Sequence, residues 1–307
     1  MRWVCCLAAL VMVLPLAGEV TAQQQELGLR ASRGGLPHDH EFALNIAPVR
    51  EYGQPVIPVF EGWFPNPDGT ITLTFEYFNL NSQEPLDVPL GPDNFIEPSE
   101  FDGVQPTHFH PAPLCCNRRH LSSFIVTIPG DYTGDVVWTL RSRGQTYSVP
   151  GRALHEAYRM DDLEAFTISP VAPELRFDPD PDGPTGRGRA GVTYGPVEAT
   201  VGVPLPISVW VDPQPAEATR VLGTYEGAQM EPRTTSILVW YHHQGPGTVI
   251  FGETETVLEG GAGEVRNTAT FSEPGEYLLR VWAIENYRAV DQHCCWSNGY
   301  IRVNVGL

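Results

Sequence analysis

Histidine and cysteine side chains gather between positions 107 and 120. His108 and His110 are two residues apart, so they share one face if this segment is a strand. Cys115, Cys116 and His120 follow within ten residues of His110. Imidazole and thiolate groups are the ligands that copper and zinc prefer. We favour a loop with surface histidines and oxidised cysteines, and a copper or zinc site is the second interpretation.

Four cysteines remain if the apolar start of the chain is removed on export. They form two vicinal pairs, Cys115-Cys116 and Cys294-Cys295. An oxidising compartment favours disulfides over thiols, and four cysteines allow three connectivities. We expect at least one bond between the two pairs. Bonds within each pair, metal thiolates and free thiols are the alternatives.

An acidic repeat lies in the middle of the chain. Asp178, Asp180 and Asp182 precede Gly183, a spacing that opens many calcium loops. The twelfth position of such a loop is Arg189 here, where a calcium loop has a bidentate glutamate. A solvated acidic linker is therefore the favoured interpretation, with calcium binding as the alternative.

The remaining histidines indicate no catalytic motif. His38 and His40 lie in an N-terminal arm, and His242 and His243 end a predicted strand, where we expect both to lie on the surface. His155 starts a His-Glu pair without the second histidine of zinc proteases. The sequence also has no Gly-x-Ser-x-Gly elbow. We therefore predict that the protein is not an enzyme.

The composition narrows the class of protein. The chain has 307 residues, with 37 acidic against 19 basic residues and a formal net charge of −18. This balance argues against binding of nucleic acid, which calls for a basic patch. The absence of lysine excludes Schiff-base and phosphate-loop lysines. Frequent glycine (30) and proline (29), with only 18% charged residues, are typical of a turn-rich β protein.

The first residues have the pattern of a secretory signal peptide. Arg2 precedes an apolar run over residues 3–17, and small residues at Val20 and Ala22 suit a cleavage site. We therefore interpret residues 1–22 as a signal peptide. The rest has no apolar run long enough to cross a membrane. We expect a secreted or periplasmic protein with no membrane span after signal cleavage.

Many stretches of the mature chain have an apolar residue at every second position, which is the period of a strand face. This pattern covers residues 71–77, 124–128, 136–140, 205–211, 237–241, 277–283 and 301–305. Turn sequences separate them, and no helical pattern of ten residues intervenes. The sequence predicts an all-β protein with two immunoglobulin-like β-sandwich domains in tandem. We place an N-terminal arm at 23–50, the first sandwich at 51–172, a Pro/Asp/Gly linker at 173–192 and the second sandwich at 193–307.

Part of the second half resembles a known family. Residues 238–241, 245–251 and 269–280 resemble bacterial immunoglobulin-like domains of the polycystic-kidney-disease type. This resemblance implies that Trp240 fills the sandwich core and that Tyr277 is the tyrosine corner at the start of strand F. Residues 62–69, 77–79, 89–95 and 294–296 also resemble a group of uncharacterised secreted bacterial proteins. No activity follows from that resemblance.

We therefore expect a secreted, non-enzymatic structural or binding protein without a resident cofactor. Its partner would be an extracytoplasmic protein or a glycan. One alternative is a copper- or zinc-binding protein that uses the cluster at 108–120. Another is a carbohydrate-binding protein that uses Trp63, Phe64 or Trp296, although ordinary core packing also accounts for these aromatic residues.

Overall fold

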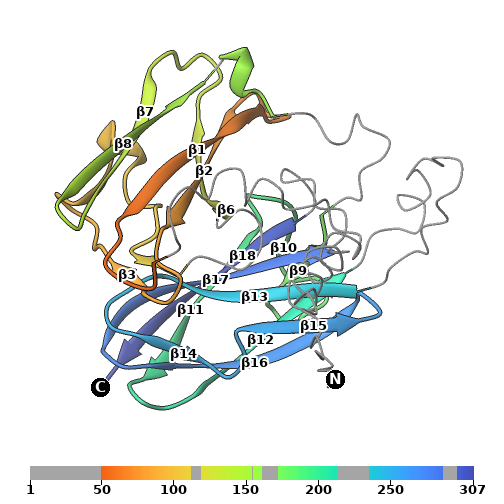
Figure 1. The fold of residues 1–307 in the computed structure, drawn as a ribbon. Helices are drawn as coiled ribbons and strands as arrows, with labels where there is room; N and C mark the ends of the chain where they lie inside the picture. Colours follow the sequence, from red (N-terminus) through yellow and green to blue (C-terminus); the bar gives the residue numbers. More distant parts are fainter. Residues whose placement is uncertain (1–49, 112–118, 154, 161–171, 213–234, 286–295) are drawn as a thin grey trace, which may run out of the picture. The chain divides into compact units, whose positions relative to one another are not determined.

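The computed structural model describes residues 50–111, 119–153, 155–160, 172–212, 235–285 and 296–307. Val49–Leu307 forms one compact unit. Its described residues form strands and the loops between them, with short 3₁₀ turns at Ser99–Phe101 and Glu156–Tyr158. The predicted all-β class with two β-sandwiches is confirmed (Figure 1). The predicted signal peptide, residues 23–49 of the predicted arm, and Cys115, Cys116, Cys294 and Cys295 lie outside the described residues.

The first sandwich has two three-stranded sheets, in the orders β1-β2-β6 and β4-β7-β8, and a small β3-β5 ladder. The strands are β1 (Val56–Pro65), β2 (Ile71–Asn79), β3 (Leu86–Asp87), β4 (Asn94–Glu97), β5 (His108–Phe109), β6 (Arg119–Ile128), β7 (Asp135–Ser142) and β8 (Gln145–Arg152). β1 and β2 form a hairpin, in which Pro65 pairs with Ile71 across a tight turn. Gly69 adopts a φ of 85° in that turn, which suits glycine.

Aromatic rings fill the first core. Phe75 and Phe124 stack with their ring centroids 5.1 Å apart, and Trp138 meets Phe124 edge-on at 4.8 Å. The Trp138 indole N–H donates to Oδ1 of Asn94 at 3.0 Å. Both side chains are fully buried. The alternating apolar residues of β2, β6 and β7 therefore pack together between the two sheets.

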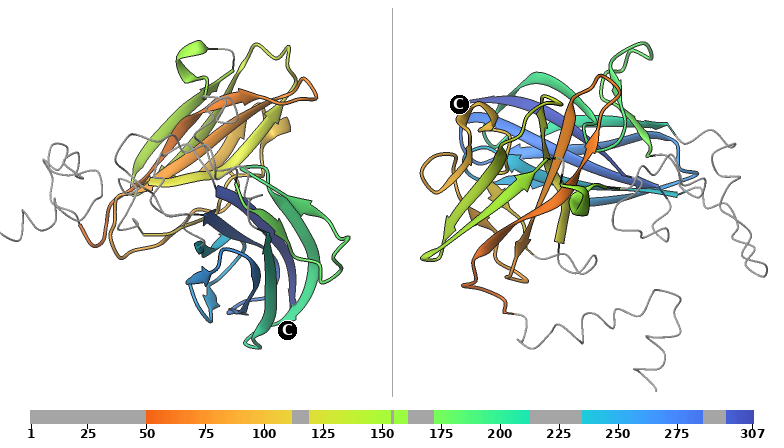
Figure 2. Two further views of the ribbon diagram at one scale, coloured as in Figure 1. Left: turned by 90° about the vertical axis from the view of Figure 1, so that its right-hand side faces the viewer. Right: turned by 90° about the horizontal axis from the view of Figure 1, so that it is seen from above.

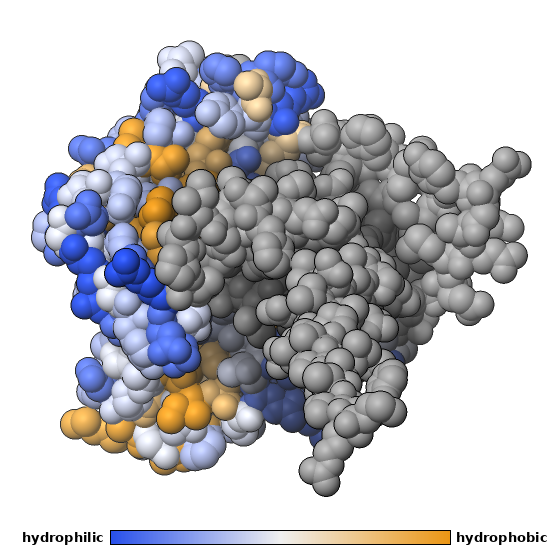
Figure 3. All heavy atoms as spheres, in the orientation of Figure 1, coloured by the Kyte–Doolittle hydropathy of each residue, from blue (hydrophilic) through white to orange (hydrophobic). Residues whose placement is uncertain are grey.

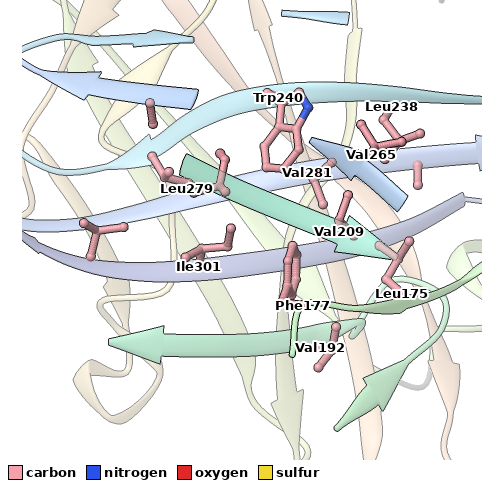
Figure 4. Close-up of a cluster of buried hydrophobic side chains, with 14 of the residues drawn as sticks. Leu175, Phe177, Val192, Val209, Leu238, Trp240, Val265, Leu279, Val281 and Ile301 are labelled. Atoms are coloured by element: carbon pink, nitrogen blue, oxygen red, sulfur yellow. The ribbon is translucent and has the colours of Figure 1, made fainter. Parts of the chain in front are cut away.

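The second sandwich has two five-stranded sheets, in the orders β10-β9-β12-β16-β14 and β11-β18-β17-β13-β15. Its green-to-blue strands lie together in both views of Figure 2. The first sheet contains β9 (Glu174–Arg176), β10 (Thr185–Gly186), β12 (Leu205–Asp212), β14 (Val249–Phe251) and β16 (Gly263–Phe271). The second contains β11 (Val192–Thr200), β13 (Thr235–Gln244), β15 (Glu255–Glu259), β17 (Gly275–Glu285) and β18 (Trp296–Gly306). Alternate side chains of the facing strands meet in one core that includes Leu238, Trp240, Leu279 and Val281 (Figure 4).

The strand order of the second sandwich is that of the immunoglobulin fold. The neighbours β9-β12-β16-β14 correspond to A-B-E-D, and β13-β17-β18 correspond to C-F-G. Trp240 lies on the C strand and is 2% exposed. The hydroxyl of Tyr277, on the F strand, donates to the backbone oxygen of Glu273 at 2.8 Å. This is the bond of a tyrosine corner, as the sequence predicted.

The predicted linker at 173–192 is wrong over most of its length. β9 in this stretch pairs with β12, and β10 pairs with β9. Leu175 and Phe177 are buried in the second core. The Pro/Asp/Gly sequence at 178–184 is therefore a turn between two strands of the second sandwich. The turn residues at 178–184 are typical of linkers, so the sequence did not indicate that the two preceding apolar side chains, Leu175 and Phe177, belong to a core.

Candidate functional site: the histidine-rich junction and its groove

Arg280 on β17 connects the second sandwich to β6 of the first. Its Nη2 donates to the backbone oxygens of Leu121 at 3.1 Å and Ser122 at 3.0 Å. Its Nε donates to Oδ1 of Asn298 at 2.8 Å, and Nδ2 of Asn298 also donates to Ser122. Arg280 is only 4% exposed. Hydrogen bonds from a buried charged donor are stronger than neutral ones, so this residue fixes β6 against β17 and β18.

A second arginine reinforces the same contact. Nε of Arg189 donates to the hydroxyl of Ser122 at 2.9 Å, and that hydroxyl donates to Oε2 of Glu61 at 2.7 Å. The Arg189 guanidinium also lies 3.8 Å from Oε1 of Glu61 and 4.9 Å from the ring centroid of Trp296. Burial lowers the pKa of Arg189, which the Glu61 carboxylate opposes. Arg189, which follows shortly after β10, is thus part of the junction between the sandwiches.

Apolar side chains complete this contact. Leu121 of β6 clusters with Trp282, Ile284 and Trp296 of the second sandwich. Trp296 is 3% exposed. Trp63 is also buried, in the first core, and its indole N–H donates to the backbone oxygen of His155 at 2.9 Å. These two tryptophans are therefore not available as a carbohydrate platform, and core packing accounts for them.

Three histidines and one aspartate meet at the junction. Nδ1 of His108, on β5, lies 2.6 Å from Oδ1 of Asp87 on β3. The His108 ring stacks on His242 of β13, with centroids 4.6 Å apart, and meets His110 at 4.7 Å. His108 and His110 therefore lie together, and the expected surface position is wrong for His108, which is 9% exposed. Asp87 and His242 join them through the fold, although no spacing in the sequence connects them.

Three of the imidazole rings at the junction have their Nε2 atom next to a backbone oxygen. Nε2 of His110 lies 3.1 Å from the oxygen of His242, and Nε2 of His120 lies 2.9 Å from that of Pro111. Nε2 of His243 lies 3.2 Å from the oxygen of Val104. A carbonyl oxygen only accepts hydrogen bonds, so each of these three rings carries its proton on Nε2. These histidines tie together segments far apart in the sequence.

Burial keeps these imidazoles neutral. Desolvation lowers the pKa of His120 and of His242 from 6.5 to about 4, and that of His243 to about 3. The pKa of His110 is also well below 6.5, because of burial and then the neighbouring His108 and His120. The histidines with lowered pKa are therefore uncharged at neutral pH, which suits a packed junction.

The predicted surface position of His242 and His243 is wrong. They are 1% and 3% exposed. A bulge in the pairing of β13 with β17 follows His242. Both residues face groups of the first sandwich, because His242 stacks on His108 and His243 bonds to Val104. Local sequence held no signal of this burial, since it arises from the docking of residues more than 130 positions away.

The described histidines do not form a metal-binding set. Among the described residues, no group of three histidine, cysteine, aspartate or glutamate side chains is placed to hold a metal ion. The rings of His108 and His242 are only 23° from parallel, so their nitrogen lone pairs do not converge. Nε2 of both His110 and His120 is occupied by a backbone oxygen. Cys115 and Cys116 lie outside the described residues, so the predicted site that includes them stays a prediction.

The acidic repeat forms a self-contained turn. Oδ1 of Asp178 accepts from the amide of Asp180, and Oδ1 of Asp180 accepts from the amide of Asp182. Arg176 donates to the backbone oxygens of Asp178 and Asp180. A calcium loop offers oxygens to the ion, whereas here backbone amides and a guanidinium engage several of them. Calcium binding at these residues stays untested.

A groove of about 1240 Å³ lies beside the histidine cluster. It is lined from the first sandwich by Asp87, Pro89, Leu90, Gly103, Val104, Thr107, Phe124 and Ile125. From the second, its lining includes Thr193, Pro196, His243, Glu273, Glu276, Leu278, Tyr300, Arg302 and Asn304. Both sandwiches therefore supply walls, and the contacts of Arg280 and the histidines hold these walls in place. Sequence reasoning found no signal for this feature.

Comparisons with known proteins identify no family. No family model and no curated protein matches the chain. Domains 4 and 5 of the S-layer protein SbsC match with 11% identity over 59% of this chain and 69% of that one, at a TM-score of 0.25. The D0–D1 domain of intimin matches with 10% identity over 80% and 97% of the two chains, at 0.22. CfaE, the adhesive subunit of CFA/I fimbria of enterotoxigenic Escherichia coli, matches with 7% identity over 81% and 79%, at 0.22.

Structural agreement at these scores does not identify a common topology or function. The fold assignment rests instead on the strand order and on the bond between Tyr277 and Glu273. Within the described residues, no helix has the length and apolar character needed to cross a membrane.

Proposed function

We propose that the chain is an extracytoplasmic, non-enzymatic binding protein that holds its ligand in the groove between its two sandwiches. The observation that supports this most directly is the groove itself, because residues of both sandwiches line it. Small-molecule and peptide sites are typically concave and sit where domains meet. The signal-peptide pattern of residues 1–22 supports export. The resemblance of residues 235–285 to polycystic-kidney-disease-type domains is part of this proposal.

The surroundings of His108 support a binding role over a catalytic one. Asp87 and His108 form a carboxylate–imidazole pair. Nucleophilic catalysis would also need a hydroxyl or thiol next to the imidazole. In the part of the chain that the structure describes, the ring of His108 instead contacts the rings of His110 and His242. This arrangement suits a contact that holds the two sandwiches together.

Apolar surface alone does not mark the site. On the described part of the face in Figure 3, apolar patches are separated by hydrophilic residues. A single large apolar patch would be the usual sign of a hydrophobic docking face. The groove differs because it combines exposed apolar residues, Leu90 and Val104, with the charged side chains of Asp87, Glu273 and Arg302.

The test is a binding screen with a blocked groove. The mature protein would be applied to a glycan array and to an array of extracellular peptides. Thr193 on β11 lines the groove and is exposed, whereas the exposed Thr200 on the same strand is not part of the lining. We expect Thr193→Trp to abolish the strongest signal and Thr200→Trp to retain it. An equal signal from both variants would place the ligand elsewhere and contradict the proposal.

A further inference from the structure

β6 differs from the other edge strands of the two sandwiches. Edge strands invite pairing with another chain, and proteins usually protect them with proline, charge or short length. Among the described edges, β1, β8 and β11 contain Pro58, Pro150 and Pro196, and β15 begins and ends in glutamate. The edges β3, β4, β5, β10 and β14 have four residues or fewer. β6 has ten residues and, after His120, contains neither proline nor a charged side chain.

Only the first half of this edge is covered by the second sandwich. The backbone oxygens of Leu121 and Ser122 accept hydrogen bonds from Arg280. Phe124 and Ile125 then line the groove. In the described part of the chain, β2 is the one strand that pairs with β6. Within the described residues, the second half of β6, residues 124–128, therefore presents an unpaired backbone edge that begins at the groove lining.

The opposite wall has the spacing of an extended chain. Tyr300, Arg302 and Asn304 alternate along β18 and line the groove, together with the buried Val303. On the neighbouring β17, Glu276 and Leu278 flank the buried Tyr277, which also belongs to the lining. Alternate residues of a strand project every ~6.6–6.8 Å on one face. An extended segment seated in the groove would meet these side chains in step with its own alternate residues.

Charge selects among extended segments. Asp87, Glu273 and Glu276 supply three carboxylates to the groove lining, against the single guanidinium of Arg302. Glu273 and Glu276 are exposed, and the Asp87 side chain is 59% exposed. His243, which also lines the groove, is neutral because burial lowers its pKa to about 3. The lining is therefore negative, like the chain as a whole, and favours a cationic ligand.

We propose that the groove binds an extended, arginine- or lysine-bearing segment of another polypeptide, which adds as a strand to residues 124–128 of β6. Main-chain hydrogen bonds to β6 supply affinity, and the carboxylates select the basic side chains. This inference rests on the proposed function, since it names the ligand class of the same groove.

Hydrogen exchange and calorimetry on the full mature protein test it. The probe is a capped seven-residue peptide that alternates valine and arginine. We expect saturable binding and slower amide exchange within residues 124–128. Methylation of alternate peptide amides has a distinctive outcome, because successive amides of a strand point to opposite edges. A peptide methylated at the amides that face β6 should bind about tenfold more weakly or worse. A peptide methylated at the other, alternate amides should bind as well as the unmethylated peptide.

Matched charge variants locate the binding. Glu276→Arg, in the groove, should weaken binding several-fold, whereas Glu255→Arg, on the distant edge strand β15, should leave it unchanged. Equal losses in both variants, or equal tolerance of both methylated sets, would mean non-specific charge attraction and overturn the inference. Strong protection, in the free protein, of those amides of residues 124–128 that point away from β2 would also overturn it, since that edge would already be paired.

Failure of the inference is distinguishable from failure of the proposed function. If the peptide does not bind but another ligand does, and Thr193→Trp blocks that ligand, the groove is a binding site for a different class of molecule. If the protein binds ligands but Thr193→Trp weakens the binding of none of them, both the inference and the proposed function fail.

Discussion

Strands β2 and β13 both bury every second side chain, but their other faces have different surroundings. β13, in the second sandwich, alternates buried and intermediate side chains over most of its length. β2, in the first sandwich, alternates apolar and polar residues, yet its first seven residues are all buried. Thr72, Thr74 and Glu76 occupy the face that the alternation predicts to be solvated. Alternation therefore identifies a strand, but it does not show whether the polar face meets water or protein.

The difference continues at the junction, which buries polar groups of the first sandwich. Glu76 forms an ion pair with Arg119, and Glu61 contacts Ser122 and Arg189. The second sandwich instead has an apolar core between two sheets. Variants that affect the polar junction should thus behave differently from variants in an apolar core.

Acid should have the largest effect. His120 and His242 take up a proton near pH 6.5 when unfolded but only near pH 4 when folded. The unfolded state therefore binds more protons between these pH values, so stability present above pH 6.5 is lost as the pH falls towards 4. Each shift corresponds to about 3 kcal/mol, and His243 adds to the loss in the same direction.

Urea unfolding at a series of pH values measures this loss. The junction also contains the cation Arg280 and the carboxyl group of Asp87. Because the folded state lowers the pKa of Asp87 from its ordinary value of 3.8, further stability is lost as the pH falls below 3.8. His243→Gln should flatten the pH profile, whereas His155→Gln at an exposed position should leave it unchanged. A midpoint that stays constant between pH 7 and 4 would contradict the neutral state of these histidines.

Cysteine connectivity should have the next largest effect. β6 begins three residues after Cys116, and β18 begins next to Cys295. Residues of these strands meet at the junction, where Asn298 donates to Ser122. We therefore expect at least one bond between the two pairs. Such a bond closes a loop of nearly 180 residues, for which chain entropy predicts about 5 kcal/mol. Non-reducing peptide mapping would show one linked peptide, and two separate peptides that are each oxidised would mean vicinal bonds.

Removal of the Arg280 guanidinium should destabilise the junction. Arg280→Met leaves the buried oxygens of Leu121 and Ser122 without this donor, and we expect a loss of about 3 kcal/mol. Arg266→Met is the matched control, because that side chain is 79% exposed and its ion pair lies on the surface. Equal unfolding midpoints for the two variants would show that Arg280 does not hold the sandwiches together.

Sequence patterns predicted the second sandwich better than the junction. The positions of Trp240 and Tyr277 followed from a local resemblance, and the structure confirms both. β9 was missed because Leu175 and Phe177 precede a Pro/Asp turn that is typical of linkers. Asp87, His242 and Arg280 were missed because their partners are distant in sequence. Local periodicity indicates which residues can form a strand. The junction contacts depend instead on how the two folded sandwiches pack against each other.

The two core tryptophans should respond differently to loss of their indole N–H. The Trp138 N–H donates to the buried Asn94, whereas the buried N–H of Trp240 has no hydrogen-bond partner among the described residues. Trp138→Phe therefore leaves an unsatisfied acceptor, and Trp240→Phe removes an unsatisfied donor. We expect Trp138→Phe to be the more destabilising by about 1–2 kcal/mol in urea unfolding. The reverse order would mean that cavity size, not hydrogen bonding, distinguishes the two cores.

Two buried threonines give the smallest and most specific test. In the part of the chain that the structure describes, the hydroxyl of Thr74, on the buried polar face of β2, has no hydrogen-bond partner. The hydroxyl of Thr139 on β7 lies 2.8 Å from that of Ser148. Valine has nearly the shape of threonine but lacks the hydroxyl. Thr139→Val leaves Ser148 without this partner and should cost about 1 kcal/mol. Thr74→Val removes a polar atom that was desolvated without compensation, so it should be neutral or stabilising by up to about 1 kcal/mol. Differential scanning calorimetry on both variants decides the point. A clear loss for Thr74→Val would mean that its hydroxyl has a partner, and that the polar face of β2 is a satisfied network.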